Sequence, residues 1–282
     1  MRYKIIGDSC LDLTKEMRKD PCYSMIPLTL MVGERHFVDD ETFDQKEFIK
    51  VVKEYPECPK SACPSPEMFK EAYCCEEENV FVITLSAALS GSYNSAVLAK
   101  SLYEEEYGKK NILVLDSKSA SSGQLNIAMY IRELCDQGLE FDEICEEMLR
   151  YHKHTHLLFS LESLANLARN GRVKPAVAAV ARMLGIRVIG QASEAGELDV
   201  LCKTRGEHGA LERIVLELKE HGYTNGRLHI SHCGNPAAAE RLKHMVKAVF
   251  DGAKVDISEC GGLCSYYAEL GGLLVGYEDA EA

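Results

Sequence analysis

Short apolar runs rich in β-branched residues alternate with longer segments of helical period along most of this chain. The short runs predict strands, and the segments with apolar positions three and four residues apart predict helices. The expected strands are Tyr3–Ile6, Val80–Leu85, Asn111–Leu115, Arg187–Ile189, Arg227–Ile230, Lys254–Ile257 and Leu273–Tyr277. The expected helices are Gln45–Tyr55, Pro66–Cys75, Ser92–Tyr107, Gln124–Gln137, Phe141–His152, Pro175–Leu184, Glu207–His221 and Pro236–Phe250. This alternation predicts an α/β fold.

The second half of the chain has a different pattern from the first. Two extended runs within Val188–Lys203 flank Glu194–Glu197, which predicts a β-hairpin. We therefore expect two α/β domains, with a mostly parallel sheet flanked by helices in 1–155 and a mixed α+β sheet with helices in 156–282. The boundary is placed near His152–Phe159 by this change of pattern, because no Pro/Gly/Ser-rich linker or internal repeat marks it.

Composition narrows the class of protein. With 282 residues, 46% of them apolar, the chain can bury a substantial core. No run approaches the roughly 20 apolar residues that span a bilayer, and the N-terminus turns polar too soon for a signal peptide, so we expect a cytoplasmic protein without a transmembrane segment. Its twelve cysteines are then expected to be reduced thiols, and pairs such as Cys260/Cys264 lack the C-x-x-C spacing of a metal or redox site.

Charge and motif content exclude further classes. A formal net charge of −12 opposes the attraction to phosphate on which nucleic-acid binding depends, and no basic run with aromatic residues offsets it. The chain also lacks the glycine-rich nucleotide loops, the G-x-S-x-G elbow and the H-E-x-x-H helix. Nucleotide-binding and hydrolase interpretations therefore lose their usual support, and no cofactor is expected.

Three of the early strands are followed by turns of similar chemistry. The turns carry Asp8 and Ser9, then Ser86–Ser92, then Asp116–Gly123. If the strands are parallel, these turns meet at one edge of the sheet, where open α/β sheets bind their ligands. The sequence predicts a shared site there for an anionic or polar group.

The middle turn carries the strongest candidates within this group. Gly91 lets the backbone approach a ligand closely, and the Ser90 and Ser92 hydroxyls lie beside the expected start of a helix, where a carboxylate is favoured. Alternatively, Ser90 is only a helix N-cap that satisfies a backbone donor. Both interpretations fit the residues. Asp8 and Asp116 could likewise be helix caps. A catalytic serine would need a nearby base, and no pattern identifies one.

Other polar residues have two interpretations each. His152, His154 and His156 would share one face of a strand and could ligate a metal, but hydrogen bonding at a domain junction explains them better. Arg172 and Arg205 each lie beside a glycine, as ligand contacts or as solvated charges. The apolar segment Pro175–Leu184 suits close packing in a core or beside an alkyl group.

Taken together, these segments resemble the DegV family, the fatty-acid-binding proteins that act as acyl carriers for bacterial fatty acid kinase. The resemblance spans nearly the whole chain. It is carried by Gly7–Leu13 for T-D-S-x-x-D-L, Pro27-Leu28, Leu89–Ala96 for L-S-G-T-Y-x-S-A, Val114–Ser117, Asn170–Val173 for G-G-R-I, Lys203–Gly206 for K-x-R-G, and Ile230–His232 for I-x-H.

The resemblance implies a long-chain fatty acid in an interdomain tunnel, with its carboxylate held by hydroxyls and presented to the catalytic subunit of a separate kinase. It implies Ser90, with its neighbours Gly91 and Ser92, at the carboxylate. It also implies Ser61, where the family motif T-S-Q-P-S reads Ser61–Ser65. Arg205 of the K-x-R-G match is implied at the head group or at the surface that faces the kinase, and Arg172 less directly.

The chain departs from the family pattern at two places. Ala62 and Cys63 replace Ser and Gln of T-S-Q-P-S, and Tyr267 stands where the histidine of H-T-G-P-G is expected. Tyr267 can donate one hydrogen bond in place of that histidine, but with Glu269 nearby it suits an acyl phosphate poorly. Alternatives are therefore a lipid-binding or lipid-sensing protein that does not support phosphorylation, or a small acyl transferase or hydrolase.

Overall fold

The structure, a computed structural model, describes residues 2–174 and 185–282, so the helix expected at Pro175–Leu184 lies outside the described residues. Its strands are β1 (Tyr3–Asp8), β2 (Tyr23–Ile26), β3 (Thr29–Val32), β4 (Arg35–Val38), β5 (Lys60–Ala62), β6 (Asn79–Thr84), β7 (Asn111–Asp116), β8 (Thr155–Leu161), β9 (Ile186–Ala192), β10 (Leu198–Arg205), β11 (Arg227–His232), β12 (Lys254–Glu259) and β13 (Leu273–Glu278). Its helices are α1 (Gln45–Glu54), α2 (Pro66–Tyr73), α3 (Ser92–Tyr107), α4 (Ser122–Asp136), α5 (Phe141–Tyr151), α6 (Ala165–Arg169), α8 (Gly206–Glu220), α9 (Pro236–Val249) and α10 (Gly262–Ala268), with short 3-10 helices η1 (Ser9–Leu11) and η2 (Met17–Lys19).

The N-terminal part of the chain forms a parallel sheet with strand order β2-β1-β6-β7. Successive side chains of a strand point to opposite faces, so each buried strand supplies two cores. Ile5 and Phe81 pack with α4 and α5, whereas Ile6 and Val82 pack with α2 and α3. The predicted parallel sheet flanked by helices is confirmed.

A small antiparallel sheet, with strand order β4-β3-β5, was not predicted from the sequence. Its strands are only three or four residues long, which gives the alternation too few positions to be recognised. Thr29–Val32 alternates between half-buried and buried positions. The sheet matters for the site because β5 ends at Ser61 and Ala62.

The C-terminal part forms a sheet with strand order β10-β9-β8-β13-β11-β12. Only β11 and β12 are parallel neighbours, so the sheet is mixed, as predicted. The predicted hairpin is β9 and β10, closed by a turn in which the Gly196 and Ser193 backbones are hydrogen-bonded. Residues such as Leu158, Ile189 and Val275 face α8 and α9 on one side.

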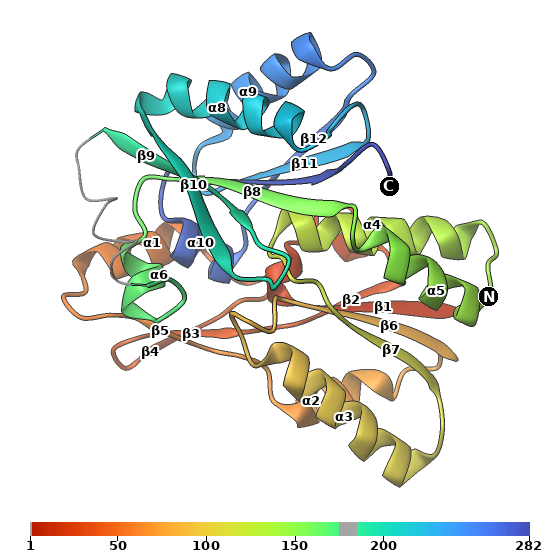
Figure 1. Cartoon of the computed structure of the whole chain (residues 1–282). Coiled ribbons are helices and arrows are strands. Elements are labelled where there is room, and N and C mark those ends of the chain that lie inside the picture. The colour runs from red at the N-terminus through yellow and green to blue at the C-terminus, as the bar shows by residue number, and fades with distance from the viewer. Residues whose placement is uncertain (1, 175–184) are drawn as a thin grey trace.

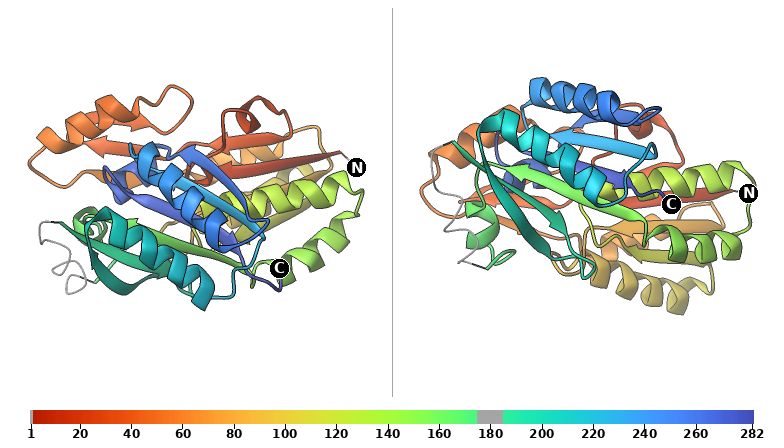
Figure 2. Two further views of the ribbon diagram at one scale, coloured as in Figure 1. Left: turned by 90° about the horizontal axis from the view of Figure 1, so that it is seen from above. Right: turned by 45° about the horizontal axis from the view of Figure 1, so that its top comes forward.

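Helix α4 lies between the two large sheets (Figure 1), where it contacts β1 and β6 on one side and β8, β11 and β13 on the other. Gly276 of β13 makes this possible, because a Cβ there would lie 2.5 Å or less from the backbone of Ser122 and Gly123. Helices α8 and α9 cover the top of the molecule in Figure 1, and α2 and α3 cover the bottom. Two further views show the same layered arrangement (Figure 2). The expected domains, 1–155 and 156–282, remain a prediction.

Candidate functional site

A cavity of about 290 Å³ lies where the three sheets approach one another. Most of its lining is aliphatic or aromatic, and the apolar members come from η1, β5, β8, β10, β13, α6 and α10 and from the segments that follow β2 and β6 and precede α3 and α4. The residues that line it are Cys10, Leu28, Ser61, Ala62, Cys63, Leu85, Leu89, Ser90, Gly91, Ala120, Leu157, Phe159, Leu161, Leu167, Arg172, Leu198, Leu263, Cys264, Tyr267, Ala268 and Leu274.

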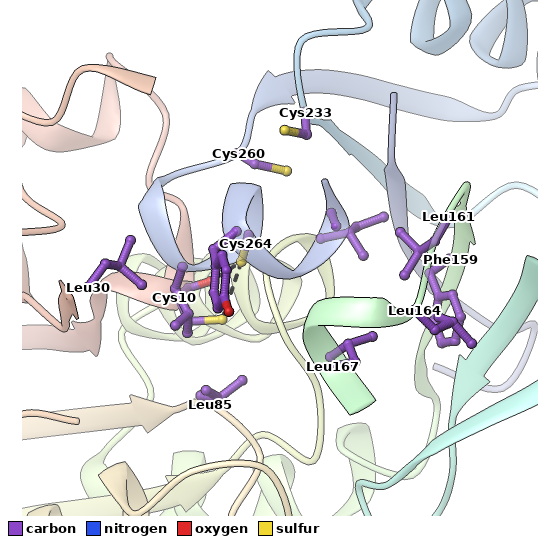
Figure 3. Close-up of a cluster of buried hydrophobic side chains, with 14 of the residues drawn as sticks. Cys10, Leu30, Leu85, Phe159, Leu161, Leu164, Leu167, Cys233, Cys260 and Cys264 are labelled. Atoms are coloured by element: carbon purple, nitrogen blue, oxygen red, sulfur yellow. Dashed lines mark hydrogen bonds between the residues drawn. The ribbon is translucent and has the colours of Figure 1, made fainter. Parts of the chain in front are cut away.

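The apolar wall follows from the alternation of β8. Leu157, Phe159 and Leu161 are two residues apart, so their side chains lie on the face of the sheet opposite to α8 and α9. Leu274 is the direct neighbour of Phe159 on β13, and Leu167 of α6 packs in the same cluster (Figure 3 shows Phe159, Leu161 and Leu167). We call the apolar part of the cavity lining, to which these residues belong, the wall.

The polar lining residues lie together with two small neighbours in one part of the cavity, which we call the mouth: Ser61, Cys63, Ser90, Arg172 and Tyr267, with Ala62 and Gly91 beside them. Most of the wall is buried, whereas Ala62, Cys63 and Gly91 are exposed and the other four are half-buried. Water therefore reaches the mouth. A ligand with an apolar body and a polar end would lie with its polar end there.

Two of the predicted site residues meet at the mouth across a long stretch of sequence. The Ser61 and Tyr267 hydroxyls share a hydrogen bond of 3.1 Å. Burial raises the pKa of Tyr267, although Ser61 and the nearby Arg172 charge oppose the shift, so the phenol stays protonated and able to donate. One of the two hydroxyls donates to the other, so the pair has one remaining O–H that can donate to an acceptor at the mouth.

Ser90 and Gly91 also lie at the mouth, at the start of α3. Gly91 is the N-cap residue, so Ser90 is not, although its Oγ accepts a 3.2 Å hydrogen bond from the Ser92 backbone. The Ser90 Oγ also donates to the Ser92 Oγ at 3.3 Å. A Cβ on Gly91 would lie 3.1 Å from the Cys63 Sγ, so the glycine lets the two segments that carry Ser61 and Ser90 come close. Ser92 is fully buried behind them and does not line the cavity.

Of the two arginines singled out in the sequence, the structure brings only Arg172 to the cavity. Its Nε donates to the Leu89 carbonyl at 3.2 Å, which holds the guanidinium beside the α3 turn. Arg205 ends β10 and is exposed, while Leu198 at the other end of that strand lines the cavity. Head-group contact by Arg205 is therefore not supported by its position, and a surface role stays a prediction.

Two buried carboxylates hold α10, the helix that carries Tyr267. Asp12 accepts from the Gly261 backbone at 2.8 Å and from the Ser121 hydroxyl at 2.5 Å. Asp39 accepts from the backbones of Gly262 and Leu263 at 2.5 and 2.9 Å. Burial is the main cause that raises the pKa of Asp12 to about 7, and it also raises the pKa of Asp39. Neither carboxylate lines the cavity, so their role is to position the helix.

The three polar strand-end turns do converge, as the parallel sheet requires. The Asp8 carboxylate accepts from the Leu85 backbone at 2.8 Å, and the Ser86 backbone donates to the Ser119 carbonyl at 3.0 Å. Asp116 accepts from the Ala87 backbone at 3.0 Å. Asp8 and Asp116 thus support these turns instead of facing a ligand. Of the three turns, the middle one contributes most to the mouth.

Two of the three histidines share one carboxylate partner. His154 and His156 both contact the Asp279 carboxylate, at 3.1 and 2.9 Å, whereas His152 follows α5. All twelve cysteines are free thiols in this structure. Within residues 2–174 and 185–282, no group of three or more His, Cys, Asp and Glu side chains is arranged to hold a metal ion. None of the helices in these ranges has the length and apolar character to cross a bilayer.

Sequence reasoning missed most of the cavity wall. Cys10, Leu28 and Leu263 look like ordinary core residues. Nothing in their spacing distinguishes a residue that lines a cavity from one that lies in a filled core. Ala62 and Cys63 line the mouth, and the sequence does single them out, because they depart from the T-S-Q-P-S motif whose first residue here is Ser61. A cavity with an apolar wall and a small polar mouth defines an α/β small-molecule-binding protein.

Comparison with known proteins places this chain within a particular family. The model of the DegV family, described as uncharacterised proteins, matches residues 2–278. A DegV domain-containing protein of Streptococcus gordonii is 38% identical over 280 residues, which cover 99% of each chain. The chain therefore belongs to the DegV family.

Solved structures show the same fold. The Streptococcus pneumoniae Fatty Acid Kinase (Fak) B3 protein, loaded with linoleic acid, has a TM-score of 0.94 and 37% identity, with 99% of each chain covered. A DegV family protein from Eubacterium eligens, loaded with heptadecanoic acid, has a TM-score of 0.94 and 34% identity, covering 98% of this chain and 99% of that one.

Proposed function

We propose that this protein binds one long-chain fatty acid in the cavity, with the acyl chain against the wall and the carboxylate at the mouth. In this proposal it is not an enzyme. It presents the carboxylate to the catalytic subunit of a separate fatty acid kinase, which phosphorylates it. The free thiols and the need for a phosphate donor suit a protein of the cytoplasm.

The charge of the lining is the observation that carries the proposal. Among the described residues, those that line the cavity include one cation, Arg172, and no Asp or Glu. Ser61, Ser90 and Tyr267 add hydroxyls beside that cation. Such a set of donors favours a carboxylate as the ligand, because hydrogen bonds to a charged acceptor are stronger than those to a neutral one. The wall suits the acyl chain of a fatty acid, and burial of a second charge against it would cost free energy.

Burial of the acyl chain supplies the affinity. At about 0.8 kcal/mol per methylene, a chain of about 16 carbons provides on the order of 10 kcal/mol before the cost of ordering it. The hydroxyls and Arg172 then need only fix the orientation of the carboxylate. This division explains how a ligand could be held by many weak apolar contacts and yet expose one end to a partner.

The lining argues against an acyl transferase or hydrolase. Serine attack requires a base within hydrogen-bond reach, and no histidine, Asp, Glu or lysine is among the cavity-lining residues of 2–174 and 185–282. Phosphoryl transfer also needs groups that bind nucleotide phosphates, and the sequence has no such loop. These absences favour a separate catalytic subunit. Two relatives of this chain that are loaded with fatty acids, one of them named for a fatty acid kinase, support the same proposal.

A lipid-binding protein that does not support phosphorylation is the second candidate. It is favoured by Tyr267, because this phenol cannot carry the positive charge that a histidine can bring to an acyl phosphate. Arg172 is the cation left at the mouth among the described lining residues.

One experiment tests both candidates. The protein is purified and denatured, and its organic extract is analysed by mass spectrometry; we expect close to one fatty acid per chain. Lipid-free protein is then reloaded with oleate and mixed with a bacterial fatty acid kinase subunit and ATP, and acyl phosphate is measured. Acyl phosphate supports the carrier, and bound lipid without acyl phosphate supports the second candidate. No lipid in the extract and no binding of oleate would overturn both.

A further inference from the structure

Two cysteines from distant parts of the sequence meet in the wall of the cavity. Cys10 lies in η1 and Cys264 in α10, and both line the cavity. Their Sγ atoms are 3.4 Å apart, and Figure 3 shows the two thiols facing each other. Both side chains are almost fully buried from outside water, so small molecules in the cavity would reach them most directly.

The surroundings hold this pair in place. Asp12, two residues after Cys10, binds the Gly261 backbone just before α10, and Asp39 binds the first residues of the helix. These hydrogen bonds hold η1, which carries Cys10, and α10, which carries Cys264, in fixed positions. A disulfide has an S–S distance of about 2.0 Å, so the two sulfurs need only a small approach and side-chain adjustment.

Both thiols have a raised pKa. The hydrogen bond with Cys264 lowers the pKa of Cys10, but burial and the nearby Asp8 and Asp12 outweigh it and leave the pKa raised. The pKa of Cys264 is also raised, first by the hydrogen bond with Cys10 and then by burial. Both groups are therefore mainly thiols, and because either sulfur can donate in their hydrogen bond, either cysteine can supply the attacking thiolate while the other resolves it.

We propose that Cys10 and Cys264 form a peroxide-oxidisable dithiol, and that a ligand in the cavity shields it. The thiolate of one cysteine attacks one oxygen of a hydroperoxide, the O–O bond breaks, and the other oxygen leaves as hydroxide or alkoxide, which takes up the proton that the thiol released. The thiol of the other cysteine then displaces water from this sulfenic acid, forming the disulfide. The peroxide is reduced by two electrons and the dithiol is oxidised by two. The shielding rests on the proposed function, whereas the oxidation does not.

The first arm of the test uses the full chain stripped of lipid. It is treated with hydrogen peroxide, blocked with a thiol reagent, digested and analysed by mass spectrometry. We expect a cross-linked peptide pair that contains Cys10 and Cys264, and its reversal by a dithiol reductant. Formation of other disulfides in its place, or no disulfide at all, would overturn the proposal.

Single substitutions test the pairing of the two thiols. Cys264→Ala removes the resolving thiol, so dimedone should trap a sulfenic acid at Cys10. Cys233→Ala is the matched control, because Cys233 is buried in the same cluster but does not line the cavity. This control should leave the Cys10–Cys264 cross-link unchanged, and its loss in the control would contradict the assignment.

The second arm repeats the oxidation with oleate. Ligand at about 100 times its dissociation constant leaves about 1% of the protein free, so cross-linking should slow by roughly a hundredfold if only the empty cavity reacts. An unchanged rate in a protein shown to bind oleate would overturn the shielding. If oleate does not bind, the proposed function fails, while the first arm still decides whether the dithiol exists.

Discussion

The mouth and the wall of the cavity are built in different ways. The mouth takes Ser61 from β5, Ser90 from the turn before α3, Arg172 from the segment after α6 and Tyr267 from α10. The wall takes several of its residues from one strand, β8, whose alternation places Leu157, Phe159 and Leu161 on one face. The mouth depends on the meeting of separate elements, whereas much of the wall depends on local strand geometry.

This difference separates affinity from orientation. Apolar contacts in the wall are numerous and individually small, so removal of one methylene changes binding little, whereas a charge placed there changes it greatly. Contacts at the mouth are few and partly solvated, so each has a moderate and distinct effect. The predictions below test this contrast.

The largest effect is expected from a charge in the wall. Leu198→Asp places a carboxylate in the cavity on the half-buried end of β10, where the fold should tolerate it. An unpaired charge against an acyl chain costs several kcal/mol, so oleate affinity should fall by at least about a hundredfold. Isothermal titration calorimetry measures the change. Leu149→Asp is the matched control, because Leu149 is 69% exposed on α5 and does not line the cavity. Equal affinity of both variants would contradict the assignment of the wall.

A smaller effect concerns Asp12, which supports the mouth and the wall together through α10. Burial, the largest cause, raises the pKa of Asp12 to about 7, compared with about 4 in an unfolded chain. The native state thus holds this proton more tightly, and its stability falls as the pH rises from about 4 through about 7. We expect the free energy of unfolding to decrease by about 2 kcal/mol between about pH 5.5 and about pH 8 from this group.

Urea titrations at several pH values measure this slope. Asp12→Asn should flatten it, because the amide does not ionise but still offers an oxygen to the Gly261 backbone. Asp20→Asn is a control, since the pKa of Asp20 is lowered and its titration lies at more acidic pH. A slope that is unchanged in Asp12→Asn would show that other groups cause it.

The smallest effect is expected at the mouth. Ser90→Ala removes one hydroxyl from a partly solvated set, so oleate affinity should fall by about tenfold, which corresponds to one hydrogen bond to a charged group. Ser101→Ala, on the exposed face of α3, should change nothing. The affinity of Ser90→Ala for a fatty alcohol of the same length should fall less than its affinity for the acid. An unchanged affinity for the acid would remove Ser90 from the site.

The sequence was sufficient for much of the fold. Parallel strands such as Asn79–Thr84 are buried on both faces and therefore appear as continuous apolar runs, and α3 begins and ends at the predicted residues, Ser92 and Tyr107. The hairpin of β9 and β10 was also recognisable from its turn. The three-residue and four-residue strands β2 to β5 were not, because so few positions carry no clear period.

The candidate site divides in a similar way. Motif resemblance pointed to Ser61, Ser90, Gly91 and Tyr267, and the structure brings these four to one mouth. It also pointed to Ser92 and Arg205, which the structure places outside the lining. Short motifs give the type of residue but not the direction of its side chain.

By itself, the sequence determined the two large sheets and the helices that flank them, because these depend on local period, and its short motifs indicated the types of residue at the mouth. Only the tertiary structure decided which apolar residues surround empty space and which fill a core. It also decided that Cys10 and Cys264, 254 positions apart, face each other at 3.4 Å. Cavities and such contacts arise where separate elements pack, and no local pattern records how closely two distant segments approach.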